Sequence, residues 1–564
     1  MNVRRFGCVC VVLLVSGTYG ARCRADEATP FTCKTVSLGI IPEAAVDGSL
    51  TFSPDLSHVA YVTGERGHVH VVRDGVDGPD FVDIPAGRLT EAGRPDQLRF
   101  SPDSKRLAYV AATSAGRVLV VDGRAGSPYD DIGIGKFVFS RDSRHIAAIV
   151  RTKGREFVIL DGVEQPPYST IEDSLPHFSP DSAHLYYTAR QGAGDPASDS
   201  YVIVLDGKEI CNRPYASNLT FSPDRNRYAY VAKKDGNWIV VLDGVESPGW
   251  KNIGNSLVFS RDSKHFLYCA SGADGDERLV VDGAASEFHG AIREGHYEFD
   301  PAGRAICILL SREGNFVMRG RERLGPYGYV FGAPISSPDG AHFAFPIIEK
   351  TETGEQRRFI LDGKPQEAFD DLPGEMEFSA DSTRYIYAAR RAKQMLAVVD
   401  GKTLAFEAVT HAVFSPTEHH LALVGRNDKK EKLFLDGKAG PAFDVIYGLR
   451  FSGDSTRLAY VGHTLGRMVN DREEGGKDAL VVDDHTIATA DEMAEPVFAP
   501  DGRHLLALAR TGTQWHILID GQPTPGFDAF PFQANFVFES EAGFRTVAVR
   551  EKAYQRVEVL FGGK

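Results

Sequence analysis

Apolar residues in this chain fall in short runs separated by Pro, Asp and Gly, and the same order of runs returns along its whole length. In one copy, apolar residues 98–100 lead into Ser-Pro-Asp-Ser at 101–104, and a second apolar run follows at 107–111. Pro presets φ at the second position of a turn, and Asp accepts backbone hydrogen bonds beside it. The pattern therefore predicts a β-hairpin.

The same copy predicts two further strands. Residues 118–121 form a third apolar run, Asp122 and Gly123 are residues that tolerate positive φ, and residues 129–132 form a short fourth run. The runs are rich in β-branched and aromatic residues, and no segment shows a sustained 3.6-residue period. We therefore expect an all-β chain.

A phrase resembling F-S-P-D-S-x-R-x-A-Y-V-A occurs thirteen times, at a spacing of roughly 40 residues. Its first positions are Phe52, Phe100, Phe139, Phe178, Phe221, Phe259, Phe299, Ser336, Phe378, Phe414, Phe451, Phe498 and Phe538. Four-stranded units at this spacing are typical of β-propeller blades, which bury their faces against neighbouring blades around a central channel. We therefore predict a β-propeller protein of thirteen four-stranded repeats.

The number of repeats bears on the domain organisation. Propellers typically close with about four to eight blades, so we expect two tandem rings of six plus seven blades. The seventh repeat is irregular, because Phe-Asp-Pro-Ala at 299–302 alters the phrase and Arg-Gly at 319–320 replaces Asp-Gly. This predicts a first propeller at residues 26–292 and a second at 293–564, with a boundary near 333 as the alternative.

The last repeat lacks a fourth strand, since only three runs precede Lys564. An apolar segment near residues 34–41, upstream of the first repeat, has a suitable length to fill that place. We expect it to close the last blade of the second ring.

The first residues have the features of an export signal. Arg4 and Arg5 precede an apolar stretch at 6–15, and small residues follow. We expect residues 1–25 to be a signal peptide, which makes the mature chain periplasmic or secreted. No later stretch has the roughly 18 apolar residues of a membrane helix, so we expect no integral membrane segment in the mature chain.

The phrase Phe-Ser-Pro-Asp-Ser-Lys-Arg-Leu-Ala-Tyr at 100–109 resembles the TolB-like, WD40-like (PD40-type) propeller repeat of many exported bacterial proteins, and the resemblance spans about residues 45–560. It implies a propeller that binds other proteins in the cell envelope, or one that accompanies a peptidase domain. The chain departs from both patterns. Its repeats begin where TolB carries a small α/β domain, and it contains no G-x-S-x-G motif.

Charge and cysteine content exclude several classes of partner and cofactor. The formal charge of −14 argues against nucleic acid. Beyond the signal segment, Cys33, Cys211, Cys269 and Cys307 show no C-x-x-C spacing, which argues against zinc. Cys269 and Cys307 lie on apolar strands of adjacent repeats, and we favour buried thiols over a disulfide. Only 3 Trp occur, fewer than the repeated docking motif of quinone-dependent propeller dehydrogenases needs, so we expect no cofactor.

The repeated carboxylates are candidates for chemistry. Asp occupies the first turn of ten repeats, at Asp55, Asp103, Asp142, Asp181, Asp224, Asp262, Asp339, Asp381, Asp454 and Asp501. Regular repetition indicates turn capping rather than catalysis, and we interpret the Asp-Gly pairs in the same way.

Two other groups could bind a metal. Asp-Gly-Asp-Glu at 274–277 lacks the full spacing of a calcium loop. His419 and His420 are adjacent, and neighbouring side chains on a strand point to opposite faces. We therefore expect a solvated turn, surface histidines and no metal site.

The loops on the side away from the repeated turns are basic and vary in length. Candidate partner-binding residues there are Lys153, Arg155, Lys233, Lys234, Arg357, Arg358, Arg390, Arg391, Lys393, Lys429, Lys430 and Lys432. Since function often resides in loops on a rigid scaffold, we predict a noncatalytic scaffold that binds a protein or polysaccharide in the cell envelope.

The alternative is a glycan-processing hydrolase or lyase with its site in a propeller funnel. A non-repeating cluster of Asp, Glu, His or Arg at one channel mouth would favour that enzyme, whereas evenly repeated side chains favour the scaffold.

Overall fold

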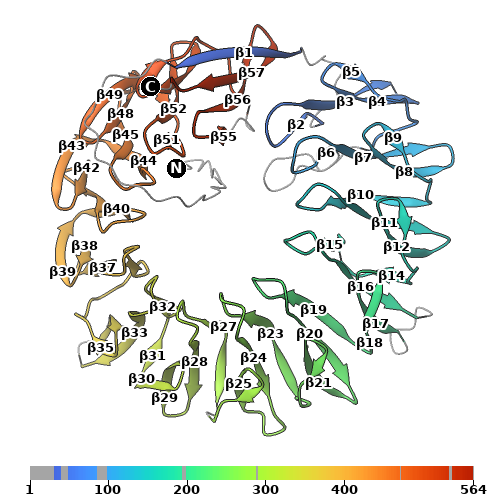
Figure 1. The fold of residues 1–564 in the computed structure, drawn as a ribbon. Coiled ribbons are helices and arrows are strands. Elements are labelled where there is room, and N and C mark those ends of the chain that lie inside the picture. The colour runs from blue at the N-terminus through green and yellow to red at the C-terminus, as the bar shows by residue number, and fades with distance from the viewer. Residues whose placement is uncertain are drawn as a thin grey trace.

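The computed structural model describes residues 31–39, 49–65, 67–85, 98–173, 175–192, 199–287, 290–352, 354–469, 472–531 and 536–562. These residues form thirteen sheets of four or five strands that stand side by side in one ring (Figure 1), which confirms the all-β propeller of thirteen blades. The signal peptide expected at residues 1–25 lies outside the described residues. The described residues contain no helix with the length and hydrophobicity to cross a bilayer.

Within each blade the strands follow one another outward from the channel (Figure 1). Blades 1 to 6 comprise β2 (Thr51–Phe52), β3 (Val59–Glu65), β4 (His68–Arg73) and β5 (Val76–Asp77); β6 (Leu98–Phe100), β7 (Leu107–Thr113), β8 (Gly116–Val121) and β9 (Arg124–Ala125); β10 (Asp131–Phe139), β11 (Ile146–Thr152), β12 (Arg155–Leu160) and β13 (Val163–Glu164); β14 (Thr170–Ile171), β15 (His177–Phe178), β16 (Leu185–Gln191), β17 (Ser200–Leu205) and β18 (Lys208–Arg213); β19 (Ala216–Phe221), β20 (Tyr228–Lys234), β21 (Asn237–Leu242) and β22 (Val245–Glu246); β23 (Asn252–Phe259), β24 (Phe266–Ser271), β25 (Glu277–Val281) and β26 (Ala284–Ala285).

The remaining blades follow the same plan, with a split inner strand in blades 8 and 12 and an extra hairpin, β46–β47, in blade 11. Blades 7 to 13 comprise β27 (Ala291–Phe299), β28 (Ala305–Ser311), β29 (Gly314–Arg319) and β30 (Glu322–Tyr327); β31 (Tyr329–Val330), β32 (Ile335–Ser336), β33 (Phe343–Thr351), β34 (Gly354–Leu361) and β35 (Lys364–Pro365); β36 (Glu377–Phe378), β37 (Tyr385–Arg391), β38 (Gln394–Val399) and β39 (Lys402–Phe406); β40 (Ala408–Phe414), β41 (Leu421–Asn427), β42 (Lys430–Leu435) and β43 (Lys438–Phe443); β44 (Val445–Phe451), β45 (Leu458–Thr464), β46 (Arg467–Val469), β47 (Arg472–Glu474), β48 (Lys477–Val482) and β49 (His485–Ala490); β50 (Glu492–Met493), β51 (Val497–Phe498), β52 (Leu505–Thr511), β53 (Gln514–Ile519) and β54 (Gln522–Pro523); β55 (Val537–Ser540), β56 (Gly543–Arg550), β57 (Ala553–Leu560) and β1 (Thr32–Gly39).

Both faces of a blade are apolar. In blade 2, Tyr109 pairs with Val120 and Val110 with Leu119 in the β7–β8 ladder. Because successive side chains on a strand point to opposite faces, Tyr109 and Val120 pack toward blade 1, while Val110 and Leu119 pack toward blade 3. Twelve clusters of this kind fill the seams between consecutive blades, from blades 1 and 2 to blades 12 and 13.

The hairpins give the ring two different faces. The Ser-Pro-Asp turns and the Asp-Gly turns, such as Asp122 (φ 52°) and Gly123 (φ 75°), emerge on one side, which we call the turn face. The hairpin turns between second and third strands, and the connections to the next blade, lie on the opposite side, which we call the loop face. Turns with positive φ at both central residues suit the right-handed twist of the flanking strands, so the turn face is nearly uniform from blade to blade.

The closing strand lies where the sequence predicts it. β1 pairs antiparallel with β57, with Thr35 opposite Val557, and becomes the outermost strand of blade 13. The last blade is therefore built from both ends of the described chain, although β1 spans 32–39 rather than 34–41.

The division into two rings, with propellers at 26–292 and 293–564, is not what the structure shows. All thirteen blades stand in a single ring around one channel (Figure 1). The irregular seventh repeat forms an ordinary four-stranded blade in which the charged residues stand at other positions of the repeat. Asp300 replaces the first turn's Ser, its fully buried carboxylate pairs with Arg304 and Arg319, and Arg319 also donates to the Gly340 carbonyl of blade 8.

The four cysteines beyond the signal segment are free thiols, which confirms the buried thiols favoured from the sequence for Cys269 and Cys307. Cys269 and Cys307 both lie in the cluster between blades 6 and 7. Burial raises the pKa of Cys307 to about 12.

Deleting β1 should weaken the ring at blade 13. A chain that begins at residue 40 leaves the edge of β57 unpaired, and unpaired edges invite association with other chains. We expect the apparent thermal unfolding midpoint to fall by about 5 °C or more. A synthetic peptide of residues 31–41 should restore it, whereas a scrambled peptide should not. An unchanged midpoint in the truncated chain would contradict the role of β1.

Candidate functional site

The aspartates of the first turn cap that turn. In blade 2 the Ser101 hydroxyl donates to Asp103 at 2.6 Å and accepts the backbone N–H of Arg106 at 3.0 Å. In blade 5 the corresponding Ser222 hydroxyl holds the pKa of Asp224 at about 2. A carboxyl group in this state is a fixed hydrogen-bond acceptor. The structure thus assigns the repeated Asp a capping role, as its regular repetition suggests.

The same turns connect neighbouring blades. The backbone N–H of Asp103 donates to the Ser143 hydroxyl of the next blade at 2.9 Å, and Asp55 donates in the same way to Ser104. This serine is the fifth residue of the phrase and has positive φ, 67° at Ser104 and 65° at Ser143. Its hydroxyl therefore acts as a staple across the seam.

The Asp-Gly aspartates form a second recurrent contact. Asp161 accepts the backbone N–H of Ile146 at 2.9 Å with one oxygen and pairs with His145 at 2.7 Å with the other. The His145 ring then stacks on Phe178 of the next blade at 6.4 Å. His or Arg takes this position in eleven blades.

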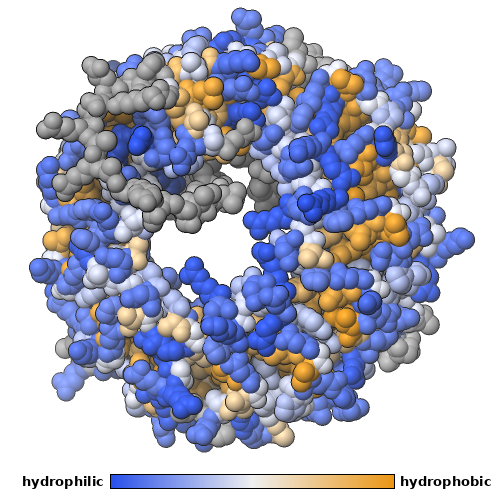
Figure 2. Space-filling model, in the orientation of Figure 1, coloured by the Kyte–Doolittle hydropathy of each residue, from blue (hydrophilic) through white to orange (hydrophobic). Residues whose placement is uncertain are grey.

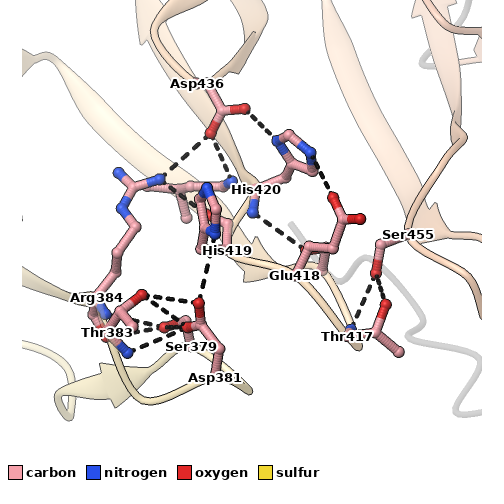
Figure 3. A network of polar contacts seen from close by, with 12 residues as sticks. Ser379, Asp381, Thr383, Arg384, Thr417, Glu418, His419, His420, Asp436 and Ser455 are labelled. Carbon is pink, nitrogen blue, oxygen red and sulfur yellow. Dashed lines mark hydrogen bonds and ion pairs between the residues drawn. The ribbon is translucent and has the colours of Figure 1, made fainter.

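The eleven pairs are His58–Asp74, Arg106–Asp122, His145–Asp161, His184–Asp206, Arg227–Asp243, His265–Asp282, His342–Asp362, Arg384–Asp400, His420–Asp436, Arg457–Asp483 and His504–Asp520. Figure 3 shows part of this network across blades 9 to 11, including the contact of Thr417 with Ser455.

The two candidate metal groups are held by other partners. Asp274 forms an ion pair with Arg278, which neutralises one carboxylate of the acidic turn. His419 lies 3.4 Å from Asp381, whereas His420 pairs with Asp436 at 2.6 Å (Figure 3). In the part of the chain that the structure describes, no three His, Cys, Asp or Glu side chains gather as a metal site would require.

The twelve candidate basic residues lie in or next to the second hairpin turns on the loop face, and half of them are paired. The ion pairs are Lys234–Glu246, Arg357–Asp371, Arg358–Glu349, Arg390–Asp371, Arg391–Glu367 and Lys430–Asp444. Arg155 donates to the Pro167 carbonyl, and Lys233 lies over the Trp238 ring. Among the described residues, Lys153, Lys393, Lys429 and Lys432 have no ion-pair partner.

An acidic signal on the loop face escaped the sequence analysis. Asp130 accepts the backbone N–H of Lys153 in the next blade at 2.7 Å, and Asp370 accepts that of Ala392 at 2.6 Å. Asp130 and Asp370 each directly follow an aromatic residue at the end of a repeat. Asp444, Asp491 and Asp528 likewise accept a backbone N–H from the next blade. These carboxylates offset much of the positive charge expected on this face.

The loop face also carries a hollow between blades 6 and 7. Its volume is about 440 Å³, and its lining includes Asp276, Leu310, Ser311 and Arg312. All four residues lie in or beside the second hairpin turns of the two blades. The hollow thus offers both polar and apolar side chains to a ligand on the loop face.

The channel is open through the ring, and the described side chains around it are mostly hydrophilic (Figure 2). Most inner strands present different side chains, so the channel wall does not repeat as the turn face does. Between blades 9 and 10 a crevice of about 180 Å³ is lined by Glu375, Glu377 and Tyr387 from one blade and by Thr410 and His411 from the next. This is a non-repeating group of titratable side chains.

Two channel glutamates have altered acidity. Partial removal of water by the surrounding protein raises the pKa of Glu377, and it raises that of Glu298 at the same position of blade 7's inner strand. A carboxyl group that stays protonated closer to neutral pH can serve as a general acid. The sequence offered no signal for these residues because they interrupt no motif.

Comparisons with known proteins find solved structures that are similar only at low sequence identity and low TM-score. The chain is similar to TolB from Acinetobacter baumannii, with 18% identity over 39% of this chain and a TM-score of 0.20. It spans 62% of the TolB chain, less than two thirds of its length. It is also similar to a eukaryotic initiation factor (14% identity, 60% of this chain and 95% of that one, TM-score 0.30).

A further similar structure is the β-propeller domain of the Trilobed protease from Pyrococcus furiosus (11% identity, 48% of this chain and 93% of that one, TM-score 0.24). No protein-family model matches the chain, and no curated protein matches its sequence.

Asp161 offers a direct test of the capping role. Asp161→Ala should lower the free energy of unfolding by about 1–3 kcal/mol, because it leaves the Ile146 N–H without its acceptor. Asp161→Asn keeps an acceptor oxygen and tolerates positive φ, so its loss should be clearly smaller. Urea unfolding of the two variants provides the comparison, and equal losses would count against the proposed hydrogen bond.

The His–Asp pairs should make stability depend on pH. Hydrogen bonding to Asp520 raises the pKa of His504, and bonding to Asp436 raises that of His420. Their stabilisation is therefore complete below the ordinary histidine pKa of about 6.5 and is lost as pH rises through the higher folded-state values.

We expect the free energy of unfolding, measured with urea, to fall as pH rises above 6.5, by up to about 1 kcal/mol for each pair. Changing both residues to Arg, which blade 11 uses at this position as Arg457, should flatten that dependence. A slope unchanged in this double variant would rule out these two pairs as its source.

Proposed function

We propose that this chain is a noncatalytic, exported β-propeller scaffold whose loop face binds a protein or polysaccharide partner in the cell envelope. The observation that carries the proposal is the contrast between the two faces. On the turn face the polar side chains are used in repeated contacts within and between blades. On the loop face the second hairpin is longer in blade 8, where β33 has 9 residues, and blade 11 gains β46–β47.

Binding residues are often found on variable loops that a rigid scaffold holds in place. Lys393, Lys429 and Lys432 support the location, because these exposed cations lie on adjacent blades 9 and 10 and lack an ion-pair partner among the described residues. An acidic protein or an acidic polysaccharide would supply the missing charge. Export rests on the signal-like features of residues 1–25.

One observation favours an enzyme instead, a hydrolase or lyase that processes glycans in the channel. Glu377 has a raised pKa and shares its crevice with Glu375 and His411. Paired carboxyl groups, one of them protonated, are the usual chemistry of glycoside cleavage.

The scaffold hypothesis predicts charge-dependent capture. The wild-type protein, the loop-face variant Lys393→Glu/Lys429→Glu/Lys432→Glu and the turn-face control Lys105→Glu/Lys264→Glu/Lys402→Glu would each be incubated with envelope extract from the source organism. Bound proteins and glycans would be quantified by mass spectrometry. Exposed ion pairs contribute up to about 1 kcal/mol each, so the loop-face variant should recover about tenfold less of the partner, and the control should match the wild type.

Equal recovery by both variants would overturn the loop-face site. Recovery of a shortened glycan, abolished by Glu377→Gln, would replace the scaffold with the enzyme.

A further inference from the structure

The outermost strand of each blade lies on the rim of the ring and leaves one edge unpaired (Figure 1). An unpaired edge presents N–H and C=O groups to which another chain can add a strand. Natural proteins protect such edges with short strands, proline or β-bulges. In twelve blades of this ring the outermost strand has at least one of these features, and blade 9 is the exception.

The protected edges fall into two groups. The outermost strand is only two residues long in blades 1, 2, 3, 5, 6, 8 and 12. It is longer in blades 4, 7, 10, 11 and 13, but there it pairs with its neighbour through an irregular register. Pro326 and Pro441 also interrupt the edges of blades 7 and 10.

The outermost strand of blade 9, β39, has none of these features. Its five residues, Lys402–Phe406, pair with β38 without a register shift and include no proline. Lys402 carries the one charge of the strand and lies beside the turn, whereas Thr403, Leu404 and Ala405 are uncharged and exposed. Leu404, at the centre, is 41% exposed. Blade 9 therefore presents a regular edge with an apolar centre.

The turn before β39 determines which backbone groups point outward. Residues 400–401 have φ of 49° and 78° and form a two-residue turn, so Val399 and Lys402 exchange hydrogen bonds as a pair. Hydrogen-bonded pairs alternate along an antiparallel ladder, which places the N–H and C=O groups of Thr403 and Ala405 on the outer edge. In the part of the chain that the structure describes, these groups have no hydrogen-bond partner.

Two other blades support this orientation. Thr403 is the second residue after the Asp-Gly pair of blade 9, and Pro365 and Pro523 occupy the same place in blades 8 and 12. Proline has no N–H to donate, so a sheet tolerates it on an edge where that N–H would face solvent. The chain thus closes this edge with proline in two blades and leaves it open in blade 9.

We propose that β39 pairs antiparallel with β39 of a second copy of this chain, which joins two four-stranded blades into one continuous sheet. In a register centred on Leu404, Thr403 of each copy lies opposite Ala405 of the other. The outward N–H groups of one copy then donate to the outward C=O groups of its partner. This inference does not depend on the loop-face site.

Three features make a second copy the fitting occupant. Leu404 lies opposite Leu404 of the second copy, at the kind of pair where Cα atoms are about 4.5 Å apart, so each exposed leucine covers the other. Lys402 and Glu407 lie at opposite ends of β39, are exposed and have no ion-pair partner among the described residues. Antiparallel pairing brings the cation of one copy near the carboxylate of the other. The rim is convex (Figure 1), so the neighbouring blades turn away from the contact.

Sedimentation velocity of the full-length protein tests the pairing. A five-residue edge makes a small interface of the weak class, so we expect half of the protein to be dimeric at about 0.1 mM. Thr403→Pro copies the residue of blades 8 and 12 and removes an outward donor from each copy, which should raise the dimer dissociation constant about tenfold or more. Ala285→Pro makes the same change on the two-residue edge of blade 6 and should leave the dimer unchanged.

Two outcomes of this experiment would overturn the proposal. One is a wild-type protein that remains monomeric at about 1 mM. The other is a dimer of equal strength in the Thr403→Pro variant, because the contact would then lie on another part of the molecule.

Disulfide cross-linking tests the register. In Leu404→Cys the two introduced thiols face each other at a distance that a disulfide can span, so air oxidation catalysed by copper phenanthroline should give more covalent dimer than the wild-type chain does. In the control Lys402→Cys the introduced thiols lie at opposite ends of the paired strands, and the yield should stay at the wild-type level. Equal yields from the two variants would contradict a register centred on Leu404.

Discussion

A sheet of four short strands with two apolar faces cannot bury either face by itself, and this constraint governs the whole molecule. Each blade is stable only because its neighbours cover it, so the core is divided into seams. Tyr109 of blade 2 belongs to one seam and Val110 to the next, although the two residues are adjacent in the chain. A ring is the arrangement in which every blade has two neighbours, and β1 completes it by returning to blade 13.

Polar contacts then fix how the blades meet. Apolar packing is not directional, whereas the hydroxyl staples and the His–Asp or Arg–Asp pairs have defined geometry and recur with nearly the same distances. These contacts hold neighbouring blades together on the turn face. The loop face and the channel wall carry no such repeated contacts, so their side chains differ between blades. The seventh blade shows that the residues can change while an ion pair persists, because Arg319 replaces the Asp of the Asp-Gly turn and pairs with Asp300, which replaces the first turn's Ser.

The sequence predicts the blades well because each depends on local signals. The Ser-Pro-Asp turn and the Asp-Gly turn each have a mechanism within one repeat. The strand near residue 34 could be predicted because the last repeat lacks a fourth strand and this apolar segment belongs to no other repeat. The number of blades in the ring has no such local signal. It depends on the angle between neighbouring blades, which is set by the packing of side chains from two different repeats, such as Phe81 and Tyr109. The channel crevice also escaped prediction, because Glu377 and His411 come from different blades and interrupt no motif.

The most direct test of this account is single-particle electron microscopy of the purified protein viewed along the ring axis. Seam-by-seam closure predicts class averages with one annulus of thirteen spokes around an open channel (Figure 1). Two smaller rings of six and seven spokes within one particle would contradict it. Such particles would show that the ring closes after six or seven blades instead of thirteen.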